Sequence, residues 1–159
     1  SQQSHQELSK QGMVMEEQKR ARTEEELKAE AVKAAALADE KRQREEQVKQ
    51  DSNLLKTFSS IEDIELVRDE RLKAIDASIK LAEKRTETIQ ADLDKRIQSA
   101  ADAERSGNAP NEALLKDIES LRRQINNNNE YIAEKRQEHE ETSREYAGNI
   151  ERFKQLKSL

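Results

Sequence analysis

The chain is short of the residues that end helices, form covalent cross-links or fill thick cores. It has no cysteine, no tryptophan, one proline, three glycines, two tyrosines and two phenylalanines. The lack of cysteine excludes disulfides and thiolate metal sites. So few aromatic residues argue against the single thick core of an ordinary globular domain. No apolar run approaches the roughly 20 residues of a membrane span, so we expect no transmembrane segment in this chain.

Charge is abundant and nearly balanced. Asp and Glu number 34 against 29 Lys and Arg, and charged residues make up 40% of the chain. Disordered chains usually carry a large net charge, whereas interspersed charges of both signs are typical of solvent-exposed helices with surface ion pairs. We therefore expect an all-α protein built from long helices.

The composition of residues 1–57 predicts one charged helix rich in Ala, Glu and Lys, and we expect its first ten or so residues to be frayed. Acid-first pairs at i,i+4 spacing support this helix: Glu16/Arg20, Glu24/Lys28, Glu40/Arg44 and Glu45/Lys49. A sparse apolar stripe at alternating spacings of three and four comprises Met13, Leu27, Ala31, Ala34, Ala38, Val48 and Leu55. Arg20, Glu24, Lys41 and Glu45 interrupt the stripe, so any coiled coil formed by it should be weak.

A break follows in "QDSNLLKTFSSIEDIE", where Ser59 precedes Glu62, and Ser60 likewise precedes Asp63, by three residues. This is the spacing of a capping box at a helix start. A second helix should therefore begin near Ser59 or Ser60. An apolar stripe at heptad spacing follows it.

The stretch "SGNAPNE" interrupts the stripe and predicts a tight turn at Ser106, Gly107, Asn108 and Pro110. Gly107 suits the left-handed position after a helix, and Pro110 suits the first turn of the next helix. Arms of similar length follow on each side of the turn. Residues 58–159 are thus predicted to form an antiparallel coiled-coil hairpin with its turn at 106–111, and the whole chain an elongated coiled coil.

Folding the chain about a centre between Gly107 and Asn108 makes the numbers of facing residues sum to about 215. Apolar positions of the two arms match in this register, and Arg68 falls opposite Tyr146, which predicts a cation–π contact. The predicted hairpin core is Ile61, Ile64, Leu72, Ile75, Ile79, Ile89, Leu93, Ile97, Ile118, Leu121, Ile125, Ile132, Tyr146, Ile150, Phe153 and Leu156.

The middle of the second arm places polar residues on the seam, namely Asn128, Lys135, His139 and Thr142. A polar seam residue lowers stability but selects register and partner number. The zone therefore serves either to fix the register or as a groove for a partner, and we favour the first interpretation.

Neither a reaction nor a cofactor is indicated by the residues. His5 and His139 are the only histidines and no cysteine exists, so neither a metal site nor a Ser-His-Asp or Cys-His set can be assembled. The glycines are too scattered for a phosphate loop, and the basic clusters are neutralised locally without interleaved aromatics. We expect no enzyme activity, no cofactor and no nucleic-acid partner.

Two stretches carry a resemblance to known proteins. The Ala/Lys/Glu segment from Glu26 to Glu46 resembles the periplasmic helical stalk of TolA. The stretch "LLKTFSSIEDIELVRDERLKAID" with the hairpin after it, covering Leu54 to Leu159, is similar to uncharacterised proteobacterial cell-envelope proteins. The resemblance implies export and a coiled-coil hairpin, and a removed signal peptide or trimming would each explain a start at Ser1.

We expect a structural or interaction scaffold of the periplasm or cell envelope, with a cytoplasmic location as the alternative. An adaptor or holdase-like chaperone that docks on a larger envelope assembly is the second functional hypothesis. The thin stripe of the first helix favours self-association as a homodimer, although the helix direction stays open. The other arrangement is a compact monomer in which the first helix folds back on the hairpin. The protein partners are not identified by the sequence.

Overall fold

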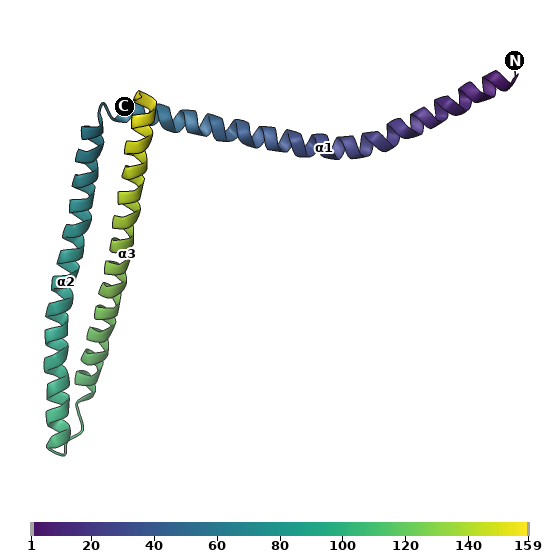
Figure 1. Cartoon of the computed structure of the whole chain (residues 1–159). Coiled ribbons are helices and arrows are strands. Elements are labelled where there is room, and N and C mark those ends of the chain that lie inside the picture. The colour runs from purple at the N-terminus through teal and green to yellow at the C-terminus, as the bar shows by residue number, and fades with distance from the viewer. Residues whose placement is uncertain (1, 159) are drawn as a thin grey trace. The chain divides into compact units, whose positions relative to one another are not determined.

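The computed structural model describes residues 2–158, except for the side chains of 2–9, 11 and 14–22. It contains three helices in the order α1 (Gln2–Thr57), α2 (Ile61–Arg105) and α3 (Glu112–Lys157), as Figure 1 shows. Within the described residues no strand is present. The all-helical prediction is confirmed.

The chain divides into two compact units, the first ending at Asn53 and the second beginning at Leu54. The last turn of α1 therefore belongs to the same unit as α2 and α3, whereas the sequence placed the boundary between residues 57 and 58.

Side chains of the first unit are exposed at every position from Thr23 to Gln50. Ion pairs join neighbouring turns, as between Arg44 and Glu40 at 3.4 Å, the predicted pair. Glu45 lies 3.9 Å from Lys41. The predicted Glu16/Arg20 pair and the expected fraying fall on residues whose side chains are outside the described part, and stay predictions.

The start of α2 differs in detail from the predicted capping box. Ser60 is the N-cap, and its hydroxyl accepts a hydrogen bond from the Asp63 backbone N–H at 3.2 Å. The Asp63 carboxylate in turn accepts hydrogen bonds from the Ser59 N–H, at 3.2 Å, and from the Ser59 hydroxyl. The cap therefore uses Ser60 and Asp63, the second of the two predicted spacings, and the Ser59/Glu62 box is wrong by one residue. Ser60 holds the extended backbone that an N-cap requires.

The turn between α2 and α3 closes as a Schellman motif. The Gly107 N–H donates to the Glu104 carbonyl at 3.0 Å, and the Asn108 N–H donates to the Ala103 carbonyl at 2.9 Å. Gly107 has φ of 77°, which confirms its predicted left-handed conformation. Pro110 precedes the N-cap Asn111, so its predicted place in the first turn of α3 is wrong.

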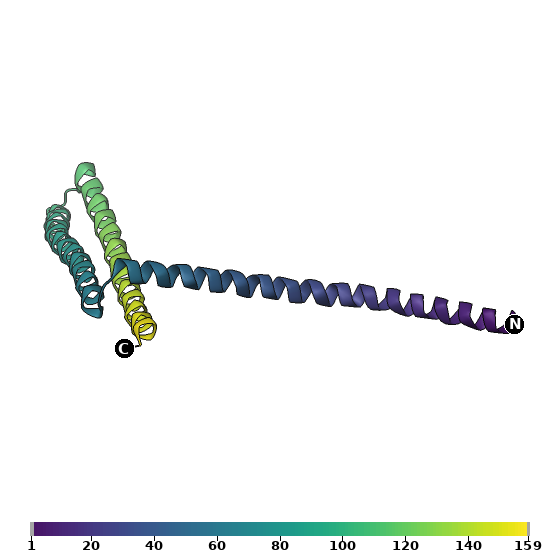
Figure 2. The same ribbon diagram turned by 90° about the horizontal axis from the view of Figure 1, so that it is seen from above.

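Helices α2 and α3 run antiparallel and lie side by side in both views (Figures 1 and 2). Contacts that cross between them include Asp76 with His139, Glu83 with Arg136, Arg96 with Asp117, and Arg71 with Tyr146. The residue numbers in these pairs sum to between 213 and 219. This agrees with the predicted sum of about 215.

The core of the helix pair is a thin stripe along the facing sides of α2 and α3. Its buried members are Ile64, Ile75, Ala82, Leu93, Ile118, Ile132, Tyr146 and Phe153. Half-buried members from the predicted core are Ile61, Leu72, Ile79, Ile89, Leu121, Ile125, Ile150 and Leu156. The pair is thus held by a narrow apolar contact with solvent on both sides.

The thickest packing lies at the end of the pair opposite the turn. Ile64, Tyr146 and Phe153 form a buried cluster there. Around it pack the partly buried side chains of Leu54, Phe58, Ile61, Val67 and Ile150. Leu54 and Val67 were not in the predicted core.

Ile97 is a predicted core residue that the structure places outside the core, since it is 39% exposed. Strict alternation of three and four after Ile89 and Leu93 leads to position 96, not 97. Accordingly Arg96 is half-buried at the seam, and Ile97 is rotated toward solvent.

Candidate functional site

The polar seam zone lies on α3 where it faces α2. We define it as Asn128, Lys135, His139 and Thr142. All four side chains are half-buried. Among the described residues no polar side chain is fully buried, and no buried polar atom is left without a hydrogen-bond partner. The zone is therefore solvated enough to avoid the cost of an unpaired buried polar group.

His139 pairs across the seam with a carboxylate of α2. Its Nε2 lies 3.4 Å from Oδ1 of Asp76. This contact is an ion pair only when the imidazole is protonated. The sequence showed no carboxylate four residues before or after His139, where Lys135 and Ser143 stand. Asp76 comes from the neighbouring helix. No group of three or more potential metal ligands is found among the described residues.

Lys135 is tied to its own helix. Its Nζ lies 2.9 Å from a Glu138 carboxylate oxygen and 5.7 Å from the centre of the Tyr131 ring. The hydrogen bond to Glu138 is the main cause that raises the pKa of Lys135 above its ordinary value. Lys135 is therefore held charged beside a solvent-exposed aromatic ring.

Two shallow grooves border the polar seam zone, both between α2 and α3. Lys135 and Thr142 line one of them together with Ile75 and Arg71. Asn128 lines the other, where Leu81 of α2 is 54% exposed beside Lys84 and Arg85. The zone thus combines exposed apolar surface, amides and basic groups.

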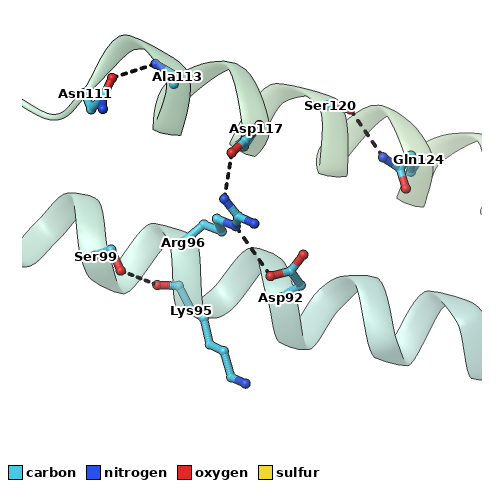
Figure 3. A network of polar contacts seen from close by, with 9 residues as sticks. All are labelled: Asp92, Lys95, Arg96, Ser99, Asn111, Ala113, Asp117, Ser120 and Gln124. Carbon is cyan, nitrogen blue, oxygen red and sulfur yellow. Dashed lines mark hydrogen bonds and ion pairs between the residues drawn. The ribbon is translucent and has the colours of Figure 1, made fainter.

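Near the turn, Arg96 links the two helices (Figure 3). Its guanidinium lies 2.6 Å from the Asp117 carboxylate on α3 and 3.4 Å from Asp92 on α2. The sequence prediction did not include Arg96, although strict seam spacing after Leu93 would have indicated it. Each exposed pair of this kind contributes about 0.2 to 1 kcal/mol and helps to set the register.

The predicted cation–π partner of Tyr146 is wrong by one helical turn. Arg71 stacks over the ring, with its guanidinium carbon 5.5 Å from the ring centre. Arg68 instead pairs with Asp69 at 3.0 Å. An arginine side chain is long enough for either position to reach the ring, so the residue numbers alone did not decide between them.

Two apolar side chains close to the turn remain exposed, Ile97 at 39% and Leu115 at 45%. Ile97 stands two heptads after Glu83, and Leu115 stands three heptads before Arg136. Since Glu83 and Arg136 meet across one side of the pair at 3.0 Å, Ile97 and Leu115 share that side. We call these two residues the apolar patch near the turn.

No protein-family model matches the chain, and neither a curated protein nor a solved structure does so. Over the described residues, none of the three helices has the apolar length that a membrane crossing needs.

α1 offers an exposed charged helix, and the helix pair offers the polar seam zone and the apolar patch near the turn. These surfaces are the parts of the described chain that a binding partner could contact.

Proposed function

We propose that the chain is a non-enzymatic interaction scaffold that presents long helices to protein partners. The observation that carries the proposal is the contrast between the two units. The helix pair has a partner for its apolar stripe within the chain, whereas all side chains of α1 from Thr23 to Gln50 are exposed. A helix of this length with no buried face in its own unit is suited to binding another helix.

The second part of the proposal is that α2 and α3 form an antiparallel coiled-coil hairpin, so that the chain is an elongated coiled coil. The seam residues of α3 follow alternating spacings of three and four from Leu114 to Leu156. Ion pairs such as Glu83 with Arg136 flank the seam, as e and g residues do in coiled coils.

Two shifted pKa values lend no support to acid–base catalysis. The pKa of Asp63 is lowered, chiefly by the hydrogen bond from the Ser59 side chain at the helix start. That of Lys135 is raised by Glu138 one turn away on the same helix. Both shifts arise from ordinary helix contacts rather than from burial in a pocket, which is where catalytic groups acquire their shifts.

We further propose a location in the periplasm or cell envelope of a bacterium. The support is the resemblance of residues 54–159 to envelope proteins and of residues 26–46 to the TolA stalk. Fractionation of producing cells, with the chain followed by antibody, checks this location. Recovery in the cytoplasmic fraction alone would contradict it.

A site-specific photo-crosslinking experiment tests the scaffold role. A photoreactive residue replaces Val32, which is 70% exposed on α1, and in a matched control replaces Ala91, which is exposed on α2. In cells that naturally produce the chain, position 32 should give discrete adducts with other proteins, and position 91 should not. Absence of such adducts at position 32 counts against the scaffold role.

A specific observation also favours the adaptor or holdase-like chaperone. Gripping chaperones present apolar residues near the tips of helical arms, and the apolar patch near the turn places Ile97 and Leu115 there. If this role holds, the full chain slows aggregation of an unfolded client protein, and replacing both residues with Glu abolishes the effect. A chain that never slows aggregation excludes the holdase.

A further inference from the structure

The charges that interrupt the apolar stripe of α1 occur in a regular order along the helix. We define the α1 seam as the eight residues at alternating spacings of four and three, namely Arg20, Glu24, Leu27, Ala31, Ala34, Ala38, Lys41 and Glu45. The described members, from Glu24 onward, are all exposed. The seam is therefore uncovered in its own unit.

The α1 seam is complementary to the α1 seam of a second copy that runs in the opposite direction. If a second α1 runs antiparallel with its centre between Val32 and Lys33, each seam residue meets the residue whose number brings the sum to 65. Glu24 then faces Lys41 of the second copy, and Lys41 faces Glu24. In the sequence Arg20 and Glu45 face each other in the same way.

The remaining seam positions match as well. Leu27 faces Ala38, and Ala31 faces Ala34, in both halves of the pair. Apolar residues therefore meet apolar residues, and each charge meets its opposite. Small alanines at the centre let two helix axes approach toward the lower end of the usual 8 to 10 Å separation.

Other alignments lose this match. In a parallel pair in register, Glu24 meets Glu24 and Lys41 meets Lys41, and like charges at facing positions are destabilising. Sliding the antiparallel pair by one heptad to a sum of 72 places Leu27 against Glu45 and Ala31 against Lys41. Sliding it the other way, to a sum of 58, sets Glu24 against Ala34.

We infer that α1 docks on α1 of a second copy of this chain, antiparallel and in the register centred between Val32 and Lys33. The paired segment from residue 20 to residue 45 is about 39 Å long. This inference deepens the proposed scaffold role, since it names one partner and the direction of the pairing. The mass of the purified chain in solution tests the pairing of two copies. Adducts with other proteins in cells test the scaffold role, so the two proposals can fail separately.

Charge reversal with rescue tests the pairing. In the full chain, Glu24→Lys turns both Glu24–Lys41 contacts of the dimer into repulsions, and Lys41→Glu does the same from the other side. By the size of exposed ion pairs, each single change should weaken dimerisation about tenfold, as measured by sedimentation equilibrium. The double variant restores both contacts and should return to within about threefold of the parent.

Matched controls separate pairing from helix stability. Glu26→Lys and Lys33→Glu make the same charge changes at exposed positions that neither belong to the α1 seam nor flank it, and they should leave dimerisation within about twofold. Circular dichroism checks that helix content is kept. Changes within one helix would make the double variant worse than either single, so its rescue is diagnostic of contacts between copies.

Cysteine cross-linking tests the direction, because the chain has no cysteine of its own. Leu27→Cys protein mixed with Ala38→Cys protein should form a disulfide-linked dimer between the two variants. Neither variant alone should do so, because like positions lie 11 residues or about 16 Å apart along the axis. A disulfide-linked dimer of either variant alone, a monomeric parent chain, or a double charge variant that fails to recover overturns the inference.

Discussion

Replacing Phe153 with Ala tests the claim that the helix pair is held mainly at the end opposite the turn. Phe153 is 1% exposed and belongs to the cluster with Ile64 and Tyr146. A buried phenylalanine removes about 150 Å² or more from water, which corresponds to about 4 kcal/mol at 25 cal/mol per Å². Loss of this side chain with a residual cavity should therefore lower the free energy of unfolding by about 3 to 5 kcal/mol.

Urea unfolding of the full chain measures this effect. Because α1 up to Asn53 forms a separate unit, total helix content would mix two transitions, and a local signal is needed. Tyr131→Phe leaves Tyr146 as the one tyrosine, and its fluorescence then reports on the cluster around Phe153.

The matched control is Ile97→Ala in the same background. Ile97 is 39% exposed, and Ala is the better helix former, so the expected loss is about 1 kcal/mol or less. Phe153→Leu keeps most of the apolar volume and should cost about 1.5 kcal/mol at most, so a measurable variant remains if the alanine variant unfolds. Equal losses from Phe153→Ala and Ile97→Ala would refute the assignment of the core.

Three further changes have defined outcomes. Gly107→Ala forces an L-residue to φ of 77° and should destabilise the helix pair by about 1 kcal/mol in thermal unfolding. Gly148→Ala lies inside α3, where open space surrounds the added Cβ, and should stabilise the pair by about 0.5 to 1 kcal/mol in the same assay. Ser60→Ala removes the N-cap of α2 and should cost about 1 kcal/mol by urea unfolding, and no loss would refute the cap. The lowered pKa of Asp63 implies a stabilisation that is present above the ordinary Asp pKa and is lost as pH falls through the lowered value, below about pH 4. Ser59→Ala should therefore raise the Asp63 pKa in an NMR titration and weaken this acid dependence, and an unchanged titration would contradict the cause given.

The pairing of α2 with α3 was predictable because the sequence signals for it are local. Gly107 and Pro110, in a chain otherwise poor in helix breakers, marked the turn, and the left-handed conformation of Gly107 is one that a residue without a Cβ adopts readily. Heptad spacing on both sides of the turn then set which faces meet. The register followed from the turn position, and the pairs Asp76–His139 and Arg96–Asp117 agree with it.

Individual contacts were less predictable. Ile97 and Arg96 differ by one position, and a step of about 100° around the helix decides which of them faces the seam. Apolar character favoured Ile97, but the regular spacing of the stripe placed Arg96 there. Arg71 rather than Arg68 reaches Tyr146 because a long, flexible side chain can span a helical turn.

The candidate surfaces divide in the same way. The polar seam zone could be placed from sequence because Asn128, Lys135, His139 and Thr142 all follow seam spacing. The carboxylate beside His139 could not, because Asp76 is 63 positions away in the chain. Leu54 and Val67 were likewise missed. They pack against the cluster around Ile64, at the end of the helix pair where the regular spacing of the α2 stripe is not kept.

The sequence by itself determined that this protein is helical, where its helices turn and which faces of α2 and α3 meet, because helix propensity, glycine conformation and heptad spacing act between near neighbours. Only the tertiary structure decided which side chains are buried and which charges pair across the helices. Those outcomes depend on the exact rotation and reach of side chains that approach one another from distant parts of the chain.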